Sequence, residues 1–357
     1  MKNKISNYSS LISTILFSVL AFITVFLLMP ANGYIESPGM ASDVSKLITI
    51  DGEHDQQPGS FNMTTVYLSK ANNLQRLLSN LQPHDTFEPS EAIEGDGTTE
   101  EFDRVSGFMM TNSIAAAQIV AYRAADKNIE VNSNGIYISS ISRESNFKNS
   151  LRVGDTITGI DNLKSSISKD IIDYLATKNP GDEITVSYIR DEKTKTADGK
   201  VILIPNSESE EYPNGRAGIG ITFIDDISIV AEPETKINAE GYGGPSAGLM
   251  FSLQIYDQLT NSNLTDGQMI AGTGTIDSEG NVGEIGGIDK KIIAANNAGA
   301  KIFFAPYFEP VKGYQDTNYN IAVATAKEYA KDIKIIPVKT FDDAVNYLKT
   351  GEIIDTK

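Results

Sequence analysis

Hydrophobic residues divide the chain into one long apolar run, followed by alternating strand-like and helix-like patterns. The run from Leu11 to Met29 contains no charged residue. A helix of this length spans about 28 Å, which is close to the hydrocarbon thickness of a bilayer. The pattern therefore predicts a transmembrane anchor over residues 11–29, preceded by a short tail over residues 1–10.

Basic residues flank this run on one side. Lys2 and Lys4 precede it, and the next basic residue is Lys46. By the positive-inside rule we expect the tail to be cytoplasmic and the chain after Pro30 to be exported. A cleaved signal peptide is the alternative, because Ala31-Asn32-Gly33 offers a small-x-small cleavage site. The run exceeds the usual signal-peptide core of about 7–15 residues, which favours an uncleaved anchor.

Residues 30–127 form an N-terminal exported region of mixed pattern. Short strand-like stretches such as Leu47–Ile50 precede a predicted helix near Leu74–Leu81, and apolar spacing predicts another helix over Ser113–Ala125. Between these helices, residues 85–103 are rich in Asp and Glu and contain no Lys or Arg. Their spacing fits no EF-hand, so a solvated flexible linker is favoured over a metal-binding loop.

A block rich in strand patterns follows over residues 128–205. Gly154-Asp155 and Pro180-Gly181 mark turns between its strand-like runs. The segments LRVGDTITGID and NPGDEITVSYIR, in this order, resemble a PDZ domain. In that family a short glycine-containing loop binds a peptide C-terminus, and the peptide adds to the sheet as a strand. The matching stretch is expected near Asn134–Tyr137, and whether the groove captures peptide stays open.

Residues 206–214 form a polar linker, and a third block over residues 215–350 alternates strand and helix patterns. Within it, Gly243-Gly244-Pro245-Ser246-Ala247-Gly248 ends a loop and opens an apolar helical run. The glycines permit close approach of a substrate backbone. Ser246 is then expected at a helix N-terminus, where backbone N–H groups and the dipole stabilise an oxyanion. The alternative is that Ser246 only caps the helix.

A second loop leads into a helix at Gly286-Gly287-Ile288-Asp289-Lys290-Lys291. Lys291 shares a helix face with small and apolar residues, whereas Lys290 is expected to face solvent. Burial and the helix dipole both disfavour the ammonium, so both lower a lysine pKa. A lysine base near neutral pH requires a fall of about three units from about 10.4. The alternative is that Lys291 extends its amino group from the apolar face into solvent.

Together the two segments resemble the proteolytic domain of Lon-type serine peptidases, in which a Ser–Lys dyad performs acyl transfer. The stretches AGTGTI, GNVGEIGG and AGAKIFFAP also match that family. The order of anchor, PDZ domain and Lon-type domain is similar to that of the membrane-anchored PDZ-containing Lon-like serine proteases of Gram-positive bacteria (the YlbL/SepM-like subgroup). The resemblance implies an α+β multidomain chain whose C-terminal Lon-type domain has a ribosomal-protein-S5-domain-2-like α/β fold.

The resemblance also implies roles for individual residues. Ser246 corresponds to the nucleophile, Lys291 to the general base and later general acid, and Thr273 to a residue that orients the lysine. Gly243 stands where ATP-dependent Lon enzymes commonly carry Asp. The sequence contains no Gly-x-x-x-x-Gly-Lys-Ser/Thr motif, so we expect no ATPase module and no requirement for ATP.

Composition excludes several other kinds of chemistry. The chain has no Cys and only two His, His54 and His84, which excludes a thiol nucleophile or a disulfide framework and leaves little for zinc. The net charge of −17 argues against nucleic acid as a partner. The resemblance, with these exclusions, implies a serine endopeptidase without cofactor or metal that cleaves exported peptides or unfolded segments at the outer membrane face, and it suggests regulated peptide processing. The alternative is a non-catalytic, PDZ-based scaffold; oligomerisation stays open.

Overall fold

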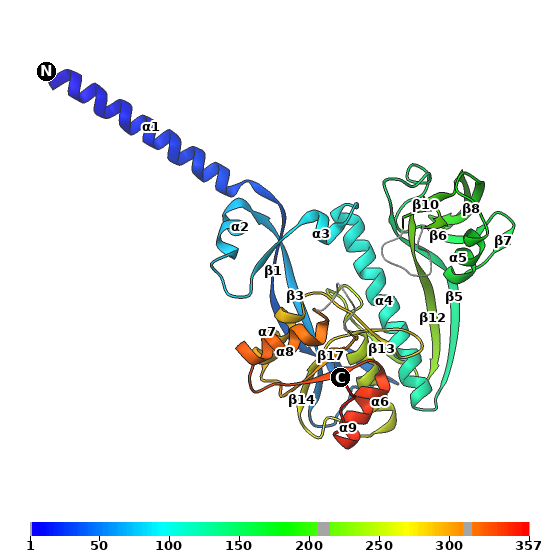
Figure 1. Cartoon of the computed structure of the whole chain (residues 1–357). Coiled ribbons are helices and arrows are strands. Elements are labelled where there is room, and N and C mark those ends of the chain that lie inside the picture. The colour runs from blue at the N-terminus through cyan, green and yellow to red at the C-terminus, as the bar shows by residue number, and fades with distance from the viewer. Residues whose placement is uncertain (1, 206–214, 310–315, 357) are drawn as a thin grey trace.

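The computed structural model describes residues 2–205, 215–309 and 316–356, so the predicted polar linker at 206–214 lies outside the described residues. The first element, α1 (Lys2–Leu28), is a helix that projects from the body of the molecule (Figure 1). Its segment Leu11–Leu28 is long and apolar enough to cross a membrane, and none of it is buried against the rest of the chain. The predicted apolar helix is therefore confirmed as a helix.

The body contains a larger and a smaller folded unit, each built around a sheet of its own. The larger unit comprises β1 (Pro30–Asp43), η1 (Val44–Lys46), β2 (Ile48–Ile50), β3 (Ser60–Asn72), α2 (Asn73–Ser79), β4 (Thr86–Pro89), α3 (Ser90–Glu94), α4 (Thr99–Ala124), β13 (Thr235–Ile237), α6 (Gly248–Thr260), β14 (Met269–Gly272), β15 (Thr275–Ile276), β16 (Val282–Gly283), α7 (Ile288–Ala298), β17 (Ile302–Pro306), α8 (Asn318–Tyr329), β18 (Lys334–Val338) and α9 (Phe341–Thr350). The smaller unit comprises β5 (Asn128–Ile141), β6 (Thr156–Ile160), β7 (Leu163–Lys164), α5 (Ser168–Ala176), β8 (Glu183–Arg190), β9 (Lys193–Lys200), β10 (Ile202–Ile204), β11 (Arg216–Gly218) and β12 (Ile221–Glu232).

The larger unit has a mixed sheet in the order β18-β17-β14-β3-β1-β4. The first four strands run parallel, whereas β1 pairs antiparallel with both β3 and β4. Successive side chains of a strand point to opposite faces. Accordingly Phe304 joins a core with α4, α6 and α9, while its neighbours Phe303 and Ala305 join a second core with α7 and α8. Helices therefore cover both faces of the sheet.

This sheet combines strands from two segments that the sequence pattern treated as separate regions, residues 30–127 and 215–350. β3 pairs in parallel with β14, with Phe61 opposite Ile270. Helix α4 contributes Ala117 and Ala121 to the same buried core as Leu253 of α6. Local periodicity predicts strands and helices, but it carries no information about which distant strands become neighbours.

The acidic segment 85–103 forms ordered elements in place of the predicted flexible linker. It contains β4, α3 and the start of α4. Thr98 and Glu101 make a reciprocal capping box at the beginning of α4, and Glu100 lies in the same first turn. Carboxylates are favourable at a helix N-terminus because they offset the positive end of the dipole. The acidic composition therefore helps α4 to start.

The smaller unit is inserted into the larger one through a long two-stranded ribbon. β5 leaves the end of α4, and β12 returns toward β13, with the two strands paired antiparallel from Ile141–Ile221 to Asn128–Glu232. At the far end, a separate core packs around Phe147, Ile157 and Val186. Figure 1 shows this ribbon running beside α4 and ending in the smaller sheet.

The predicted peptide-binding stretch near Asn134–Tyr137 is wrong, because that part of β5 has no free edge. Ile136 is paired with Asp225 of β12 on one side and with Ile157 of β6 on the other. In the sheet order β12-β5-β6-β8-β9, the open edge nearest the glycine-containing Gly218–Ile221 segment is that of β12. An added strand requires unpaired backbone groups. The outer strands β12 and β9 both offer such an edge, and β12 is the one that continues from the Gly218–Ile221 segment.

A bidentate ion pair inside the smaller unit gives a stability prediction. Arg190 donates from Nε and Nη2 to the buried Asp155 carboxylate at 2.7 and 2.5 Å. Arg190→Met leaves this carboxylate without its cationic partner, and we expect a loss of about 3 kcal/mol in the free energy of unfolding, measured by urea denaturation. The exposed pair Lys169–Asp173 is the matched control, and Lys169→Met should cost less than about 1 kcal/mol. Equal effects of the two substitutions would contradict this account.

Candidate active site

Ser246 lies at the end of the glycine-rich loop that precedes α6. The N-cap of α6 is Ala247, which makes no side-chain capping hydrogen bond. The hydroxyl of Ser246 instead accepts a hydrogen bond from Lys291 Nζ at 2.7 Å. Ser246 is partly exposed, so a substrate can approach it. Helix capping therefore does not describe this serine.

Lys291 lies in the first turn of α7 and is 3% exposed. Its amino group points into the protein toward Ser246 rather than extending to solvent. Burial lowers the pKa of Lys291 from 10.5 to about 8, and the nearby Glu36 carboxylate partly opposes this effect. A large fraction of neutral amine is therefore present at mildly alkaline pH, as a general base requires.

Thr273, fully buried just after β14, links the other two residues. Its Oγ1 accepts a hydrogen bond from Lys291 Nζ at 3.1 Å and donates one to the carbonyl of Ser246 at 3.0 Å. Because the threonine proton is committed to that carbonyl, its oxygen is left as an acceptor toward the lysine. This arrangement fixes the position of the amino group, so that it faces Ser246 Oγ as well as Thr273 Oγ1.

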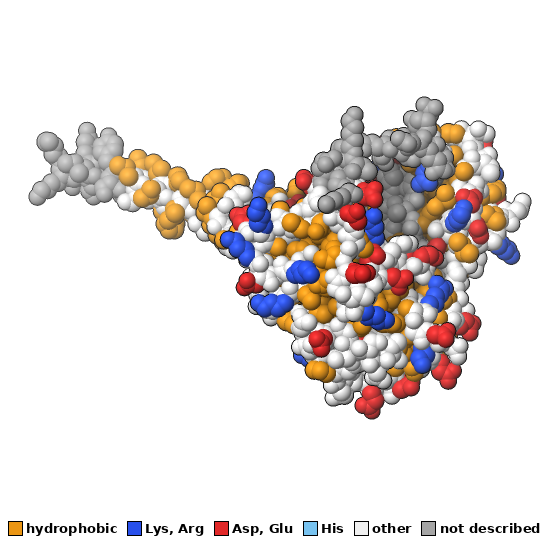
Figure 2. Space-filling view, turned by 60° about the horizontal axis from the view of Figure 1, so that its bottom comes forward, with side chains coloured by type: hydrophobic (Ala, Val, Ile, Leu, Met, Phe, Trp, Pro, Cys, Tyr) orange, Lys and Arg blue, Asp and Glu red, His pale blue; other side chains and the backbone are white. Residues whose placement is uncertain are grey.

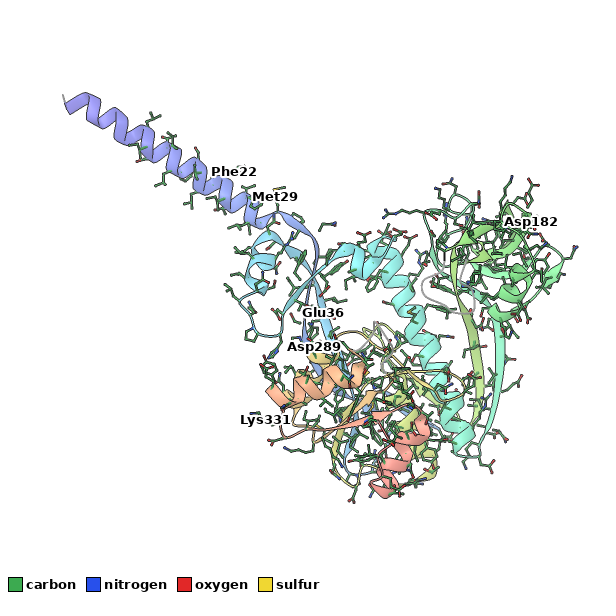
Figure 3. All side chains as sticks on the ribbon, in the orientation of Figure 1. Phe22, Met29, Glu36, Asp182, Asp289 and Lys331 are labelled. Atoms are coloured by element: carbon green, nitrogen blue, oxygen red, sulfur yellow. The ribbon has the colours of Figure 1, made fainter. Side chains whose placement is uncertain are left out.

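Lys290 is buried, and the prediction that it faces solvent is wrong. Its Nζ forms an ion pair with Glu36 of β1 at 2.9 Å and a longer one with Asp289 at 3.3 Å. Although burial disfavours the ammonium, these two carboxylates raise the pKa of Lys290 above its ordinary value. Figure 3 shows Glu36 and Asp289 close together between β1 and α7. Helix periodicity could not find this pair, because the partner strand comes from the other end of the sequence.

Helix α4 holds the serine loop from behind. Ser113 Oγ donates to the carbonyl of Pro245 at 2.9 Å, and the carbonyl of Ser106 accepts from Gly244 N–H at 2.9 Å. A Cβ at Gly248 would lie 2.7 Å from Ser113 Oγ, so this contact requires glycine. The sequence analysis missed Ser113 and Ser106, since nothing in a helical pattern identifies the loop that a helix face supports.

The histidines lie in other surroundings. The His54 ring nitrogen Nδ1 contacts the backbone carbonyls of Ser45 and Ile48, and the His84 ring packs edge-on against Tyr329. Among residues 2–205, 215–309 and 316–356, no group of three or more His, Cys, Asp or Glu side chains is placed to hold a metal ion. The site as described is a serine, a lysine and a threonine.

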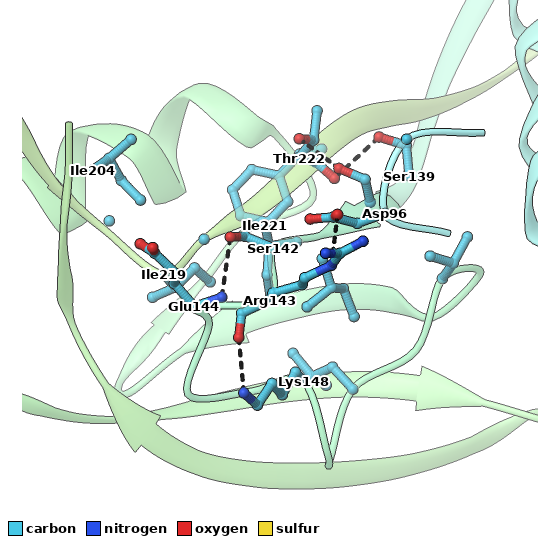
Figure 4. A pocket seen from close by; sticks show the side chains of 18 of the residues that line it. Asp96, Ser139, Ser142, Arg143, Glu144, Lys148, Ile204, Ile219, Ile221 and Thr222 are labelled. Atoms are coloured by element: carbon cyan, nitrogen blue, oxygen red, sulfur yellow. Dashed lines mark hydrogen bonds and ion pairs between the residues drawn. The ribbon is translucent and has the colours of Figure 1, made fainter. Parts of the chain in front are cut away.

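A large cleft lies outside this site and is lined by none of these three residues. It has a volume of about 1360 Å³ and lies between the α3–α4 segment and the smaller unit. Ile221 and Thr222 of β12 and Leu175 of α5 line it, together with Ser106 of α4. Figure 4 shows its polar side, where Arg143 pairs with Asp96 at 2.7 Å. β12 therefore forms one wall of this cleft. The opposite wall includes Ser106 of α4, which contacts the serine loop.

Comparison with known families gives one match in each of the two units. Residues 127–201 match the model of the PDZ domain, and residues 225–349 match the model of the Lon protease (S16) C-terminal proteolytic domain. Both families are the ones that the sequence segments resemble, and the matched ranges overlap the blocks expected at 128–205 and 215–350.

Curated relatives agree with the second match. A Lon protease of Metamycoplasma arthritidis is 34% identical over 32% of this chain, and one of Campylobacter concisus is 37% identical over 29%. The aligned parts make up only 12% and 11% of these relatives. Among solved structures, the PDZ domain of an SdrC-like protein from Listeria monocytogenes is 30% identical, with a TM-score of 0.23, and the match covers 27% of this chain and 93% of that one.

Proposed function

We propose that this chain, a PDZ-containing Lon-like protein with an N-terminal anchor helix, is a serine endopeptidase. It would work without ATP. Its predicted α+β multidomain organisation is confirmed by the two domain matches. Its substrates would be exported peptides or unfolded protein segments. Regulated processing fits one chain with a peptide-binding fold and a proteolytic fold better than bulk degradation does.

One observation carries the proposal: a buried lysine with a lowered pKa contacts a partly exposed serine. Lys291 Nζ lies 2.7 Å from Ser246 Oγ, and its pKa is about 8. A purely structural lysine gains nothing from a buried position beside a hydroxyl, because its ammonium is poorly solvated there. A nucleophile, by contrast, needs an adjacent base within hydrogen-bonding reach.

In the proposed acylation step, the neutral amine of Lys291 takes the proton of Ser246 as Oγ attacks the substrate carbonyl. The C–O bond to Ser246 forms, and the carbonyl oxygen becomes an oxyanion near the positive end of α6. Lys291 then gives its proton to the departing amine as the peptide bond breaks. Water then gives a proton to Lys291 as its oxygen bonds to the acyl carbon, and the C–O bond to Ser246 breaks as Lys291 returns that proton to Ser246 Oγ.

Location is part of the proposal. With the basic tail held in the cytoplasm, both domains would lie outside, at the surface of a Gram-positive cell membrane, where ATP is scarce. Peptide added along β12 would lie in the cleft that Ser106 also lines. The backbone carbonyl of Ser106 accepts a hydrogen bond from Gly244 of the serine loop. A peptide bound in the cleft would therefore affect the position of Ser246 through α4.

The decisive test is cleavage of unfolded exported peptides by the intact chain in detergent, compared with Ser246→Ala. We expect the substitution to abolish cleavage. A variant in which His54 and His84 are both replaced by Ala is the control, and it should cleave normally because neither ring approaches the site. If cleavage persists in Ser246→Ala, the nucleophile is wrong. If no version cleaves but peptide still binds, the non-catalytic PDZ scaffold replaces the protease.

The dependence of cleavage rate on pH provides a further prediction. The ammonium form of Lys291 cannot accept a proton, so kcat/KM should rise with pH and level off above about 8. The sign follows from the base being the deprotonated species. A profile that stays flat from pH 6 to 9, or falls with increasing pH, would contradict Lys291 as the base.

A further inference from the structure

The short helix α2 carries its hydrophobic residues on the side that faces outward. Leu74, Leu77, Leu78 and Leu81 follow the i, i+3, i+4, i+7 spacing of one helix face, and the helical hydrogen bonding continues past α2 through Leu81 N–H to Leu78 O at 2.9 Å. We call these four residues the leucine stripe. Such a stripe normally packs into the core of a protein.

Most of the leucine stripe is exposed. Leu77, Leu78 and Leu81 are 60%, 37% and 78% exposed, whereas Leu74 is half-buried. The opposite face of α2 is the one that meets the protein, with Ser79 buried and the guanidinium of Arg76 stacked 4.6 Å from the Phe87 ring. In α2 the polar face therefore packs against the protein and the apolar face points outward, the opposite of a helix that packs on a core.

The leucine stripe lies where the anchor helix joins the body. Asn73, the first residue of α2, donates from Nδ2 to the carbonyl of Phe26 at 2.9 Å and from its backbone N–H to the carbonyl of Met29 at 3.1 Å. Those carbonyls belong to the last turn of the apolar segment and its end. In Figure 2, hydrophobic side chains continue from the projecting helix onto the body at this junction.

The segment that carries the leucine stripe differs in charge from the whole chain. The protein carries a net charge of −17, yet residues 70–84 contain Lys70 and Arg76 and no Asp or Glu. Lys70 is exposed and donates to Thr99 Oγ1 at 2.9 Å. An exposed apolar face on a segment without carboxylates suits a lipid surface, whose headgroups carry phosphate.

We propose that residues 74–81 lie in the membrane interface, with Leu77, Leu78 and Leu81 inserted among the acyl chains of the leaflet from which α1 emerges. The hydrogen bonds of Asn73 hold α2 beside the end of α1, so the depth of the anchor determines the depth of the leucine stripe. The body is then attached to the bilayer at two points, and its orientation over the surface is restricted. The inference rests on α1 spanning the membrane, and its test separates the two claims.

The test uses single tryptophans as fluorescent reporters, since the chain contains no Trp. Three full-length variants, Leu81→Trp, Phe22→Trp and Val230→Trp, are reconstituted in vesicles of phosphatidylcholine and phosphatidylglycerol, with and without brominated phosphatidylcholine. Phe22 lies in the apolar segment (Figure 3), and Val230 is 64% exposed on β12, a strand that Figure 1 shows away from the junction. Bromine quenches only tryptophans that contact the acyl chains.

We expect Leu81→Trp to be blue-shifted and to lose about half of its emission with brominated lipid, as an interfacial side chain does. Phe22→Trp should be quenched, and Val230→Trp should not. If Phe22→Trp is quenched but Leu81→Trp remains solvent-exposed and unquenched, the leucine stripe does not touch lipid and the inference fails while the anchor stands. A blue shift of Leu81→Trp that occurs without quenching and increases with protein density would mean that the leucine stripe packs against a second copy of the chain. That result would also overturn the inference. Failure of Phe22→Trp to quench would overturn the anchor itself.

Discussion

Lys291→Met is expected to lower kcat/KM for peptide cleavage by about six orders of magnitude, the loss found when a unit of nucleophile and base loses either member. The substitution removes the group that takes the proton of Ser246 from 2.7 Å away. Raising the pH cannot rescue the variant, because a thioether has no accessible proton-binding site. Initial rates across pH 6–10 measure both the loss and the absence of rescue.

The fold should survive this substitution. Lys291 is charged in the folded state below pH 8, and lowering its pKa from 10.5 to about 8 costs about 3 kcal/mol of stability at pH 7. Methionine fills a similar volume without that cost, so the thermal midpoint should not fall despite loss of the hydrogen bonds to Ser246 and Thr273. Loss of activity together with unfolding would leave Lys291 with a structural role and contradict its assignment as the base.

The neighbouring lysine provides a matched control. Lys290→Met leaves Glu36 without its partner, and we expect it to destabilise the protein while folded molecules retain cleavage within about tenfold of the parent. The two lysines should therefore show opposite patterns, one losing chemistry and the other losing stability. Equal losses of activity in the two variants would contradict the assignment of Lys291 alone as the base.

Glu36→Gln is expected to change two measured quantities, the free energy of unfolding and the midpoint of the rate–pH profile. It leaves the buried ammonium of Lys290 without its closer carboxylate, which should cost about 3 kcal/mol in the free energy of unfolding. It also removes a negative charge that raises the pKa of Lys291. The midpoint of the rate–pH profile should therefore move to lower pH, and the rate at pH 7 relative to the plateau should rise.

Asp289→Asn is the control for this second prediction. Asp289 also pairs with Lys290, but its side chain is 44% exposed and the distance is 3.3 Å. Solvent screening weakens such an interaction, so we expect a stability loss below about 1 kcal/mol and little movement of the midpoint. If Glu36→Gln shifts the midpoint upward, or leaves it in place, Glu36 does not act on the charge of Lys291.

The sequence predicted the local parts of the site because each is encoded by neighbouring residues. The loop Gly243–Gly248 and the helix start at Gly287–Lys291 occur as predicted, and the structure brings Ser246, Lys291 and Thr273 together. The helix face that carries Lys291 could be derived from spacing alone, because small and apolar residues surround it along α7. The roles of these three residues remain predictions until the substitutions are measured.

What the sequence did not predict depends on contacts between distant segments. Lys290 lies on the polar side of α7, but β1 brings Glu36 to that side and buries the pair. Likewise, the residues of β5 resemble those of a peptide-binding strand. In the structure, however, β12, which follows the inserted unit in the sequence, pairs with the edge of β5 that a peptide would need. In both places the local pattern predicted the helix or strand correctly but not the distant segment that packs against it.

The central claim, that Lys291 activates Ser246, is tested most directly by the acyl-enzyme. An activated p-nitrophenyl ester is mixed with the intact chain, the reaction is stopped by acid, and the acylated residue is located by mass spectrometry of peptides. We predict acyl transfer to Ser246 with a rate that rises with pH to a plateau above about 8, and none at Ser246 in Lys291→Met. Acylation of Ser246 at the same rate in Lys291→Met as in the parent would contradict the account.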